Sequence, residues 1–286
     1  MANSQQNVGY YLPQPSSWPI TGSIALLLMA LGFVWFLSGN KTGLWVVLLG
    51  FAVLVYMMFG WFGTVIGESE SGKYNAQVDI SYRWSMSWFI FSEVMFFAAF
   101  FGALYYARVM SVPWLGDIDN KLLWPNYTPT WPTAGPYDSS AVKTIGAWGV
   151  PFWNTAILLT SGLTVTLAHW ALKKNNRSQL ILWLAATVAL GCLFLFLQAE
   201  EYIHAYKELG LTLGKGIYGA TFFMLTGFHG FHVTIGTIML LVILFRCIKG
   251  HFKPHHHFAF EAVSWYWHFV DVVWIGLFIF VYAIVG

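Results

Sequence analysis

Charged residues are scarce in this sequence of 286 residues. Asp, Glu, Lys and Arg together make up 9% of it, whereas an ordinary globular chain carries about 25%. Hydrophobic residues make up 58%, so too few charges are present to solvate the surface of a soluble protein. The composition therefore excludes a soluble globular domain and predicts a polytopic membrane protein.

Cysteine and net charge are low as well. Cys192 and Cys247 lie in separate apolar stretches without a CxxC spacing, which argues against a disulfide framework or a cysteine zinc site. The formal charge of +2 provides no basic field to attract nucleic acid. The sequence has no Gly-rich phosphate loop, Ser/His/Asp order or nucleophile motif, so we expect no catalytic residue. The first 17 residues contain no Lys or Arg, so we expect no secretory signal.

Long apolar runs, in contrast, are abundant. Seven of them reach about 20 residues or more, the length at which a helix crosses the hydrocarbon core of a bilayer. We predict an all-α fold with seven transmembrane helices, over residues 18–37, 43–66, 81–109, 152–172, 180–198 (continuing towards 206), 219–245 and 258–285. Short links predict a hairpin of the first two helices and another of the fourth and fifth.

The chain is expected to divide into three parts. Residues 1–66 hold the N-terminal segment and the first helix pair, residues 67–80 form a linker, and residues 81–286 hold the other five helices. Within the third part, residues 110–151 contain six prolines interleaved with Trp and Tyr. Proline stops helices and these rings favour the headgroup level, so we predict an ordered cap on the membrane surface.

Loop cations indicate an orientation. The segments on the N-terminal side carry eight Lys and Arg, and those on the other side carry six. Cytoplasmic loops are enriched in these residues, so we predict a cytoplasmic N-terminus. Seven spans then place the C-terminus on the opposite, periplasmic side.

Glu93 lies in the middle of the third apolar run. It is about 18 Å along the helix from residue 81 at 1.5 Å per residue, near the bilayer centre, where a charge costs roughly 2.5–3.5 kcal/mol. We therefore expect a mostly protonated side chain. Three interpretations remain open: a member of a proton relay, a polar contact to a subunit or lipid, and a neutral carboxyl hydrogen-bonded between helices.

Two pairs of polar residues lie three positions apart. His268 and Asp271 share one face of the last helix, where they can hydrogen-bond each other. A structural pair is favoured over a proton path. His229 and His232 also share a face, and two imidazoles can hold a metal or a haem. Such sites need further ligands or histidines from a facing helix, so we favour satisfied polar groups in a helix contact and predict no metal site.

The remaining polar groups lie near the ends of helices. Glu200 and Glu201 are expected to form a solvated helix end, and His169 stands alone and receives no role. The loop at residues 246–257 combines cations, histidines and Phe, a composition that suits anionic lipid headgroups. A metal-binding histidine tract and simple positive-inside bias are the alternatives for this loop.

Four longer motifs, taken together, are specific for one protein family. They are SEVMFF at 92–97, TAILLTSG at 155–162, TGFHGFH at 226–232 and FEAVSWYWHFVDVVW at 260–274. These segments resemble the cytochrome c oxidase subunit III family, and SWPITG at 17–22 fits that family too. The likeness covers nearly the whole chain.

The resemblance implies a seven-helix subunit of a bacterial aa3-type haem–copper oxidase in the aerobic respiratory chain of the inner membrane. The first two helices and the other five are expected to form two bundles around a V-shaped cleft filled with phospholipid. The subunit carries no redox cofactor, because haem a, haem a3 and copper belong to subunits I and II. It packs on subunit I, supports its proton uptake and protects the complex from inactivation during turnover. Membership of a respiratory supercomplex stays open.

The resemblance also implies roles for particular residues. Glu93 matches the family's membrane-buried glutamate. The positions that hold lipid headgroups at the cleft are matched by Glu68, Arg246, Lys249 and His251.

The loop after the second helix departs from the family's common pattern. Gly63 and Gly67 stand where arginines often occur, and Lys73 and Tyr74 stand where a histidine pair is frequent. Headgroup choice and proton collection by this loop are therefore left open.

Three rival functions make different predictions. An independent ion or proton transporter using Glu93, His229, His232 and Asp271 would favour internal repeats or helices broken at the midplane, and the sequence has neither. The third subunit of a related quinol oxidase usually lacks the first two helices. A di-haem membrane cytochrome predicts a Soret band in the purified chain.

Overall fold

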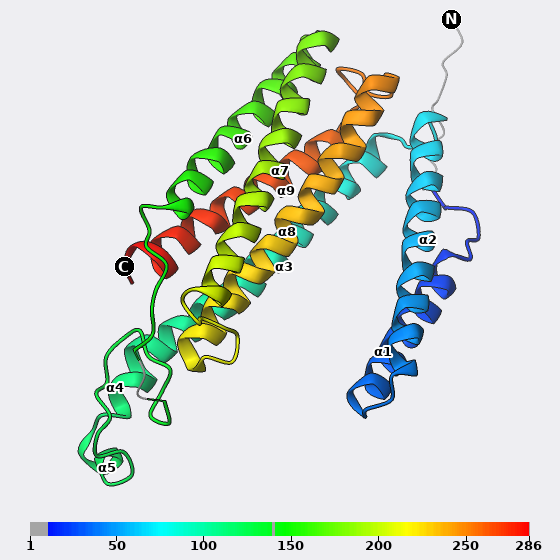
Figure 1. The fold of residues 1–286 in the computed structure, drawn as a ribbon. Coiled ribbons are helices and arrows are strands. Elements are labelled where there is room, and N and C mark those ends of the chain that lie inside the picture. Colours follow the sequence, from blue (N-terminus) through cyan, green and yellow to red (C-terminus); the bar gives the residue numbers. More distant parts are fainter. Residues whose placement is uncertain (1–10, 139–140, 286) are drawn as a thin grey trace, which may run out of the picture. The chain divides into compact units, whose positions relative to one another are not determined.

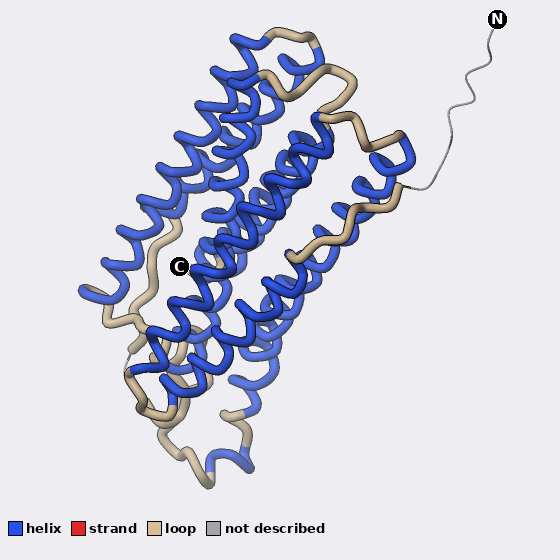
Figure 2. The backbone as a smooth tube through the Cα atoms, turned by 90° about the vertical axis from the view of Figure 1, so that its right-hand side faces the viewer, coloured by secondary structure: helices blue, strands red, loops and turns tan. Residues whose placement is uncertain are grey.

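The computed structural model describes residues 11–138 and 141–285. Within these ranges the chain is helical and contains no named strand (Figure 2). Seven helical stretches of the described chain are long and apolar enough to cross a membrane. They are α1 (Trp18–Leu37), α2 (Thr42–Glu70), α3 (Ala76–Tyr105) with its continuation to Trp114, α6 (Val150–Lys173), α7 (Arg177–Lys207), α8 (Gly216–Lys249), and α9 (Phe258–Leu277) with η2 (Phe278–Ala283). The predicted all-α fold with seven spans is confirmed.

The chain forms two compact units, one up to Tyr82 and one from Arg83 onward. In the first unit, α1 and α2 form the predicted hairpin, and glycines let their backbones approach closely. A Cβ atom on Gly32 would lie 2.6 Å from the backbone nitrogen of Val47, and one on Gly50 would lie 2.8 Å from that of Met29. Most large side chains of this hairpin point outward and are exposed in the isolated chain.

The second unit has a core of aromatic and aliphatic side chains from five helices. Neighbouring pairs are α6 with α7, α7 with α8, α8 with α9 and α6 with α9 (Figure 1). The last helix is central to this core, and its Trp267 and Trp274 are almost fully buried. The helix α3 joins through side chains, since Phe97 packs against Phe269 of α9 and Phe96 packs against Phe228 of α8.

Several helices extend beyond the apolar runs from which they were predicted. The helix α3 begins at Ala76 rather than residue 81, and Asp79 in its first turn complements the helix dipole. The helix α7 begins three residues early, because the Asn176 side chain accepts a hydrogen bond from the backbone N–H of Gln179 over 3.2 Å. Polar residues therefore continue these helices past the ends that hydrophobicity defines.

The described part of the 110–151 cap packs onto the start of α8. After the π-helical turn η1 (Tyr106–Ser111), it holds the short helices α4 (Val112–Trp114) and α5 (Ile118–Lys121) and then irregular chain. Lys215 and Asp138 form an ion pair of 2.6 Å. The rings of Trp131 and Tyr218 lie 5.7 Å apart. These contacts order the cap against the five-helix unit, and its position on a membrane surface stays a prediction.

Candidate functional site

Glu93 on α3 and His232 on α8 form a polar contact between two helices. Glu93 Oε2 lies 2.9 Å from His232 Nε2. The other ring nitrogen, His232 Nδ1, lies 2.6 Å from the carbonyl oxygen of Phe228 and therefore donates to it, because a carbonyl can only accept. The bond to Glu93 then needs one more proton, which sits on the carboxyl or on Nε2. The pair thus shares a single proton in either arrangement.

Aromatic rings surround this pair. The His232 ring lies 5.0 Å from Phe97, 6.0 Å from Phe96 and 6.3 Å from Tyr266. Such surroundings make an unpaired polar group costly, so the contact stabilises both side chains where they are. One of the three interpretations of Glu93 was a carboxyl hydrogen-bonded between helices, and the structure contains a hydrogen bond of this kind, from α3 to α8. The proton-relay and partner-contact roles stay predictions.

His229 has different partners from His232. Its Nε2 atom lies 3.2 Å from the carbonyl oxygen of Val270, and its ring lies 5.1 Å from Trp274. The side chain is buried. His229 and His232 thus bond to different groups, His229 to α9 and His232 to α3.

His268 and Asp271 lie close together on α9, with 3.6 Å between His268 Nδ1 and Asp271 Oδ2. The second ring nitrogen of His268 lies 3.3 Å from the hydroxyl of Thr166 on α6. Asp271 is buried and faces Gly162 of α6, where a Cβ atom would collide with its carboxylate. This pair therefore joins α9 to α6 at a point where only a glycine leaves room.

The predicted lipid-binding residues lie at two places. Arg246 and Lys249 are in the last turn of α8, His251 follows it, and the Arg246 guanidinium lies 4.5 Å from the centre of the Phe252 ring. In the first unit, the Tyr74 hydroxyl donates to Glu68 Oε2 over 2.9 Å. Burial, followed by hydrogen bonds with Tyr82 and Glu68, raises the pKa of Tyr74 above its ordinary value. Tyr74 thus partners Glu68, and the lipid roles of these residues stay predictions.

Comparison with known proteins supports the resemblance. The family described as Cytochrome c oxidase subunit III matches residues 8–285. The chain belongs to the cytochrome c oxidase subunit III family. It is 40% identical over 280 residues to the cytochrome c oxidase subunit 3 of Gazella subgutturosa and of Antilope cervicapra, and 39% identical to that of Syncerus caffer. In each comparison the match covers 98% of both chains.

Membership of the subunit III family confirms the recognition made from the sequence motifs. The chain is a subunit of cytochrome c oxidase, an oxidoreductase complex, and so works together with other subunits. The seven apolar helices of its described part make it a multi-pass membrane protein.

The expectation for Glu201 was wrong. This side chain is 3% exposed, and its Oε1 atom accepts hydrogen bonds from Tyr282 at 2.7 Å and Gln198 at 3.2 Å. The last turns of α7, which ends at Lys207, pack against the end of the last span, so Glu201 faces neighbouring helices instead of solvent. Glu200, one position earlier, is exposed as expected.

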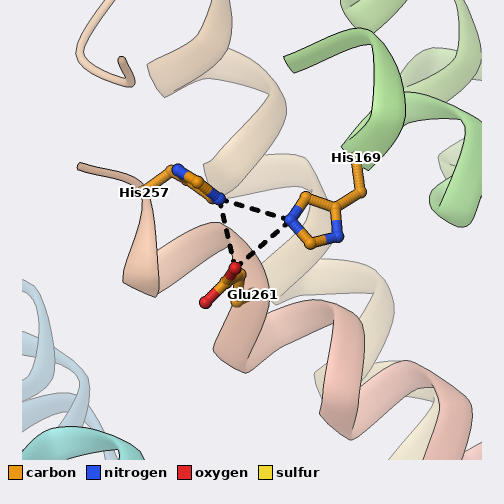
Figure 3. A group of neighbouring side chains, drawn as sticks. All are labelled: His169, His257 and Glu261. Carbon is orange, nitrogen blue, oxygen red and sulfur yellow. Dashed lines mark hydrogen bonds and ion pairs between the residues drawn. The ribbon is translucent and has the colours of Figure 1, made fainter. Parts of the chain in front are cut away.

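Sequence reasoning also missed a cluster of His169, His257 and Glu261 (Figure 3). His169 comes from the end of α6, whereas His257 and Glu261 come from the start of α9. The four-residue spacing of His257 and Glu261 is a signal that could have been used. His169 lies 88 positions before His257, and no local pattern connects them.

Proposed function

We propose that this chain is a non-catalytic subunit of a proton-pumping cytochrome c oxidase, in which it binds phospholipid, stabilises subunit I and supports proton uptake by subunit I. One observation carries the proposal. The polar side chains singled out in the spans are engaged by other helices of the chain: Glu93 by His232, His229 by Val270 and His268 by Thr166. Groups engaged in this way serve contacts between helices. Haem a, haem a3 and copper then belong to the partner subunits.

The lipid role is supported by charge and by apolar surface. Arg246 and Lys249 place two cations at the end of α8, beside the ring of Phe252, and such an arrangement suits an anionic headgroup at a membrane edge. In the isolated chain, Trp45 and Phe59 of α2 are more than two-thirds exposed. Surfaces of this kind need lipid or protein against them, which supports bound phospholipid at this hairpin.

Exposed apolar surface also supports contacts with partner subunits, and the loop cations support an orientation in the membrane. The helix α3 presents Trp84, Trp88 and Phe91 as exposed rings, and buried interfaces are rich in aromatic residues. We propose subunit I as the main partner, with subunit II in the same complex. The surplus of loop cations on the N-terminal side supports a cytoplasmic N-terminus and a periplasmic C-terminus in a bacterial inner membrane.

The test is a mild detergent purification through an affinity tag on this chain. We expect two larger subunits to co-purify with a haem a absorption spectrum, and the chain dissociated from them to be colourless. Phospholipid retained after purification would be counted by mass spectrometry. A Soret band in the dissociated chain, or ion movement by that chain alone in liposomes, would overturn the proposal.

A further inference from the structure

The ligand atoms of His169, His257 and Glu261 form a nearly equilateral triangle (Figure 3). His169 Nε2 lies 3.3 Å from His257 Nε2 and 3.4 Å from Glu261 Oε1, and the third side, from His257 Nε2 to Glu261 Oε1, is 3.1 Å. Zinc binds nitrogen and oxygen at about 2.0–2.1 Å in a tetrahedron, whose edges are then about 3.3 Å. The three atoms therefore stand at the separations of three corners of such a tetrahedron.

The hydrogen bonds around the triangle orient two of its members. His257 Nδ1 lies 3.2 Å from the carbonyl oxygen of Lys253 and donates to it, so in the neutral ring Nε2 keeps its lone pair. The guanidinium of Arg83 contacts Glu261 Oε2 and leaves Oε1 directed at the two imidazoles. Partners of this kind, on the far side of each ligand, are what hold metal ligands in place.

The cluster is largely buried but remains partly accessible to solvent. The side chains of His169, His257 and Glu261 are 19%, 9% and 11% exposed, and Phe260 packs against the His169 ring at 5.5 Å. Partial burial strengthens the attraction between a cation and the carboxylate. The remaining exposure leaves a route for an ion and for a water molecule as fourth ligand.

We propose that His169, His257 and Glu261 bind a divalent transition-metal ion, for which zinc is the best match. Two imidazoles and one carboxylate are a known zinc ligand set. The ion would connect the end of α6 to the start of α9 and to the loop before it. Its role is therefore to stabilise this end of the five-helix unit.

The first test measures zinc in the purified oxidase complex. Wild type, His169→Ala, His257→Ala and the control His256→Ala are dialysed against zinc alone at a series of free concentrations, and bound zinc is counted by plasma mass spectrometry. His256 belongs to the same histidine tract but is exposed and outside the cluster. We expect His169→Ala and His257→Ala to lose one zinc per complex, with affinity at this site at least about tenfold weaker. Unchanged binding by His169→Ala would overturn the proposal.

The second test needs no substitution and so does not depend on variants that assemble. Hydrogen–deuterium exchange of the wild-type complex is measured with and without zinc. We expect zinc to slow exchange in peptides covering the loop at 251–257 and the end of α6, because the ion links these segments. Exchange that zinc leaves unchanged in both segments would mean that the three side chains form only a hydrogen-bonded cluster, and would overturn the proposal.

Discussion

Tyr282 donates a hydrogen bond to Glu201 Oε1 over 2.7 Å and thereby joins the end of the last span to α7. Both side chains are almost fully buried. Gln198 also donates to Glu201, and its own amide oxygen accepts a hydrogen bond from Asn154 on α6. Three helices therefore meet at one buried carboxyl group near the end of α7.

Replacing Tyr282 with Phe should destabilise this junction. The change removes one donor to a buried acceptor and adds no bulk, so we expect a loss of about 1–2 kcal/mol. The measurement is the thermal midpoint at which the subunit leaves the purified complex. Tyr206→Phe is the matched control, since Tyr206 is half exposed. Equal midpoints for the two variants would show that the Tyr282 bond contributes nothing.

Replacing Gly162 with Ala should disturb the contact between α6 and α9. The added Cβ atom would collide with the Asp271 carboxylate, and overpacking of this kind costs about 1–3 kcal/mol. Gly230→Ala on α8 is the control, because a Cβ atom there meets no described atom within 4 Å. The thermal midpoint at which the subunit leaves the complex should fall for Gly162→Ala and stay unchanged for Gly230→Ala. A fall of the same size in both would contradict the proposed collision.

Replacing Glu93 with Gln should leave assembly intact. The amide can donate to His232 Nε2, whose lone pair is available because Nδ1 donates to Phe228. Glu93→Leu, in contrast, leaves Nε2 without a partner and should cost about 1–3 kcal/mol. Subunit content and oxidase activity are measured together. If Glu93→Gln abolishes activity in an intact complex, the pair has a role in proton transfer beyond its contact between helices.

Replacing Arg246 and His251 together with Ala should loosen bound phospholipid and hasten inactivation during turnover. The double change removes one cation and one imidazole from the same end of α8. Lys41→Ala, in the loop before α2, is the control for loss of a surface cation. Native mass spectrometry reports lipid occupancy, and occupancy equal to that of the control would count against this lipid site.

The spans could be predicted from the sequence because each is a long apolar run, and hydrophobicity alone defines such a segment. The start of α7 could not, since the Asn176 cap that fixes it is polar. Glu201 lies in the polar last turns of α7, a composition that favours a solvated helix end.

The contacts of the candidate sites depend on tertiary packing. Glu93 and His232 are 139 positions apart, and the sequence singled out each residue without connecting the two. His268 and Asp271 were expected to pair because a helix places residues three apart on one face, and their nearest polar atoms lie 3.6 Å apart. His169 received no role, because its partners become neighbours only after α6 and α9 pack together.

The close glycine contact between α1 and α2 has a consequence for how this hairpin meets its surroundings. Since backbone atoms occupy the seam, the hairpin holds together with few large side chains between its helices, and its rings and branched chains remain directed outward. The contacts that hold the two helices together and the side chains that face other molecules thus lie on different faces of the hairpin. Substitutions on the outer face can change which molecule binds there, while the glycine contacts keep the two helices together.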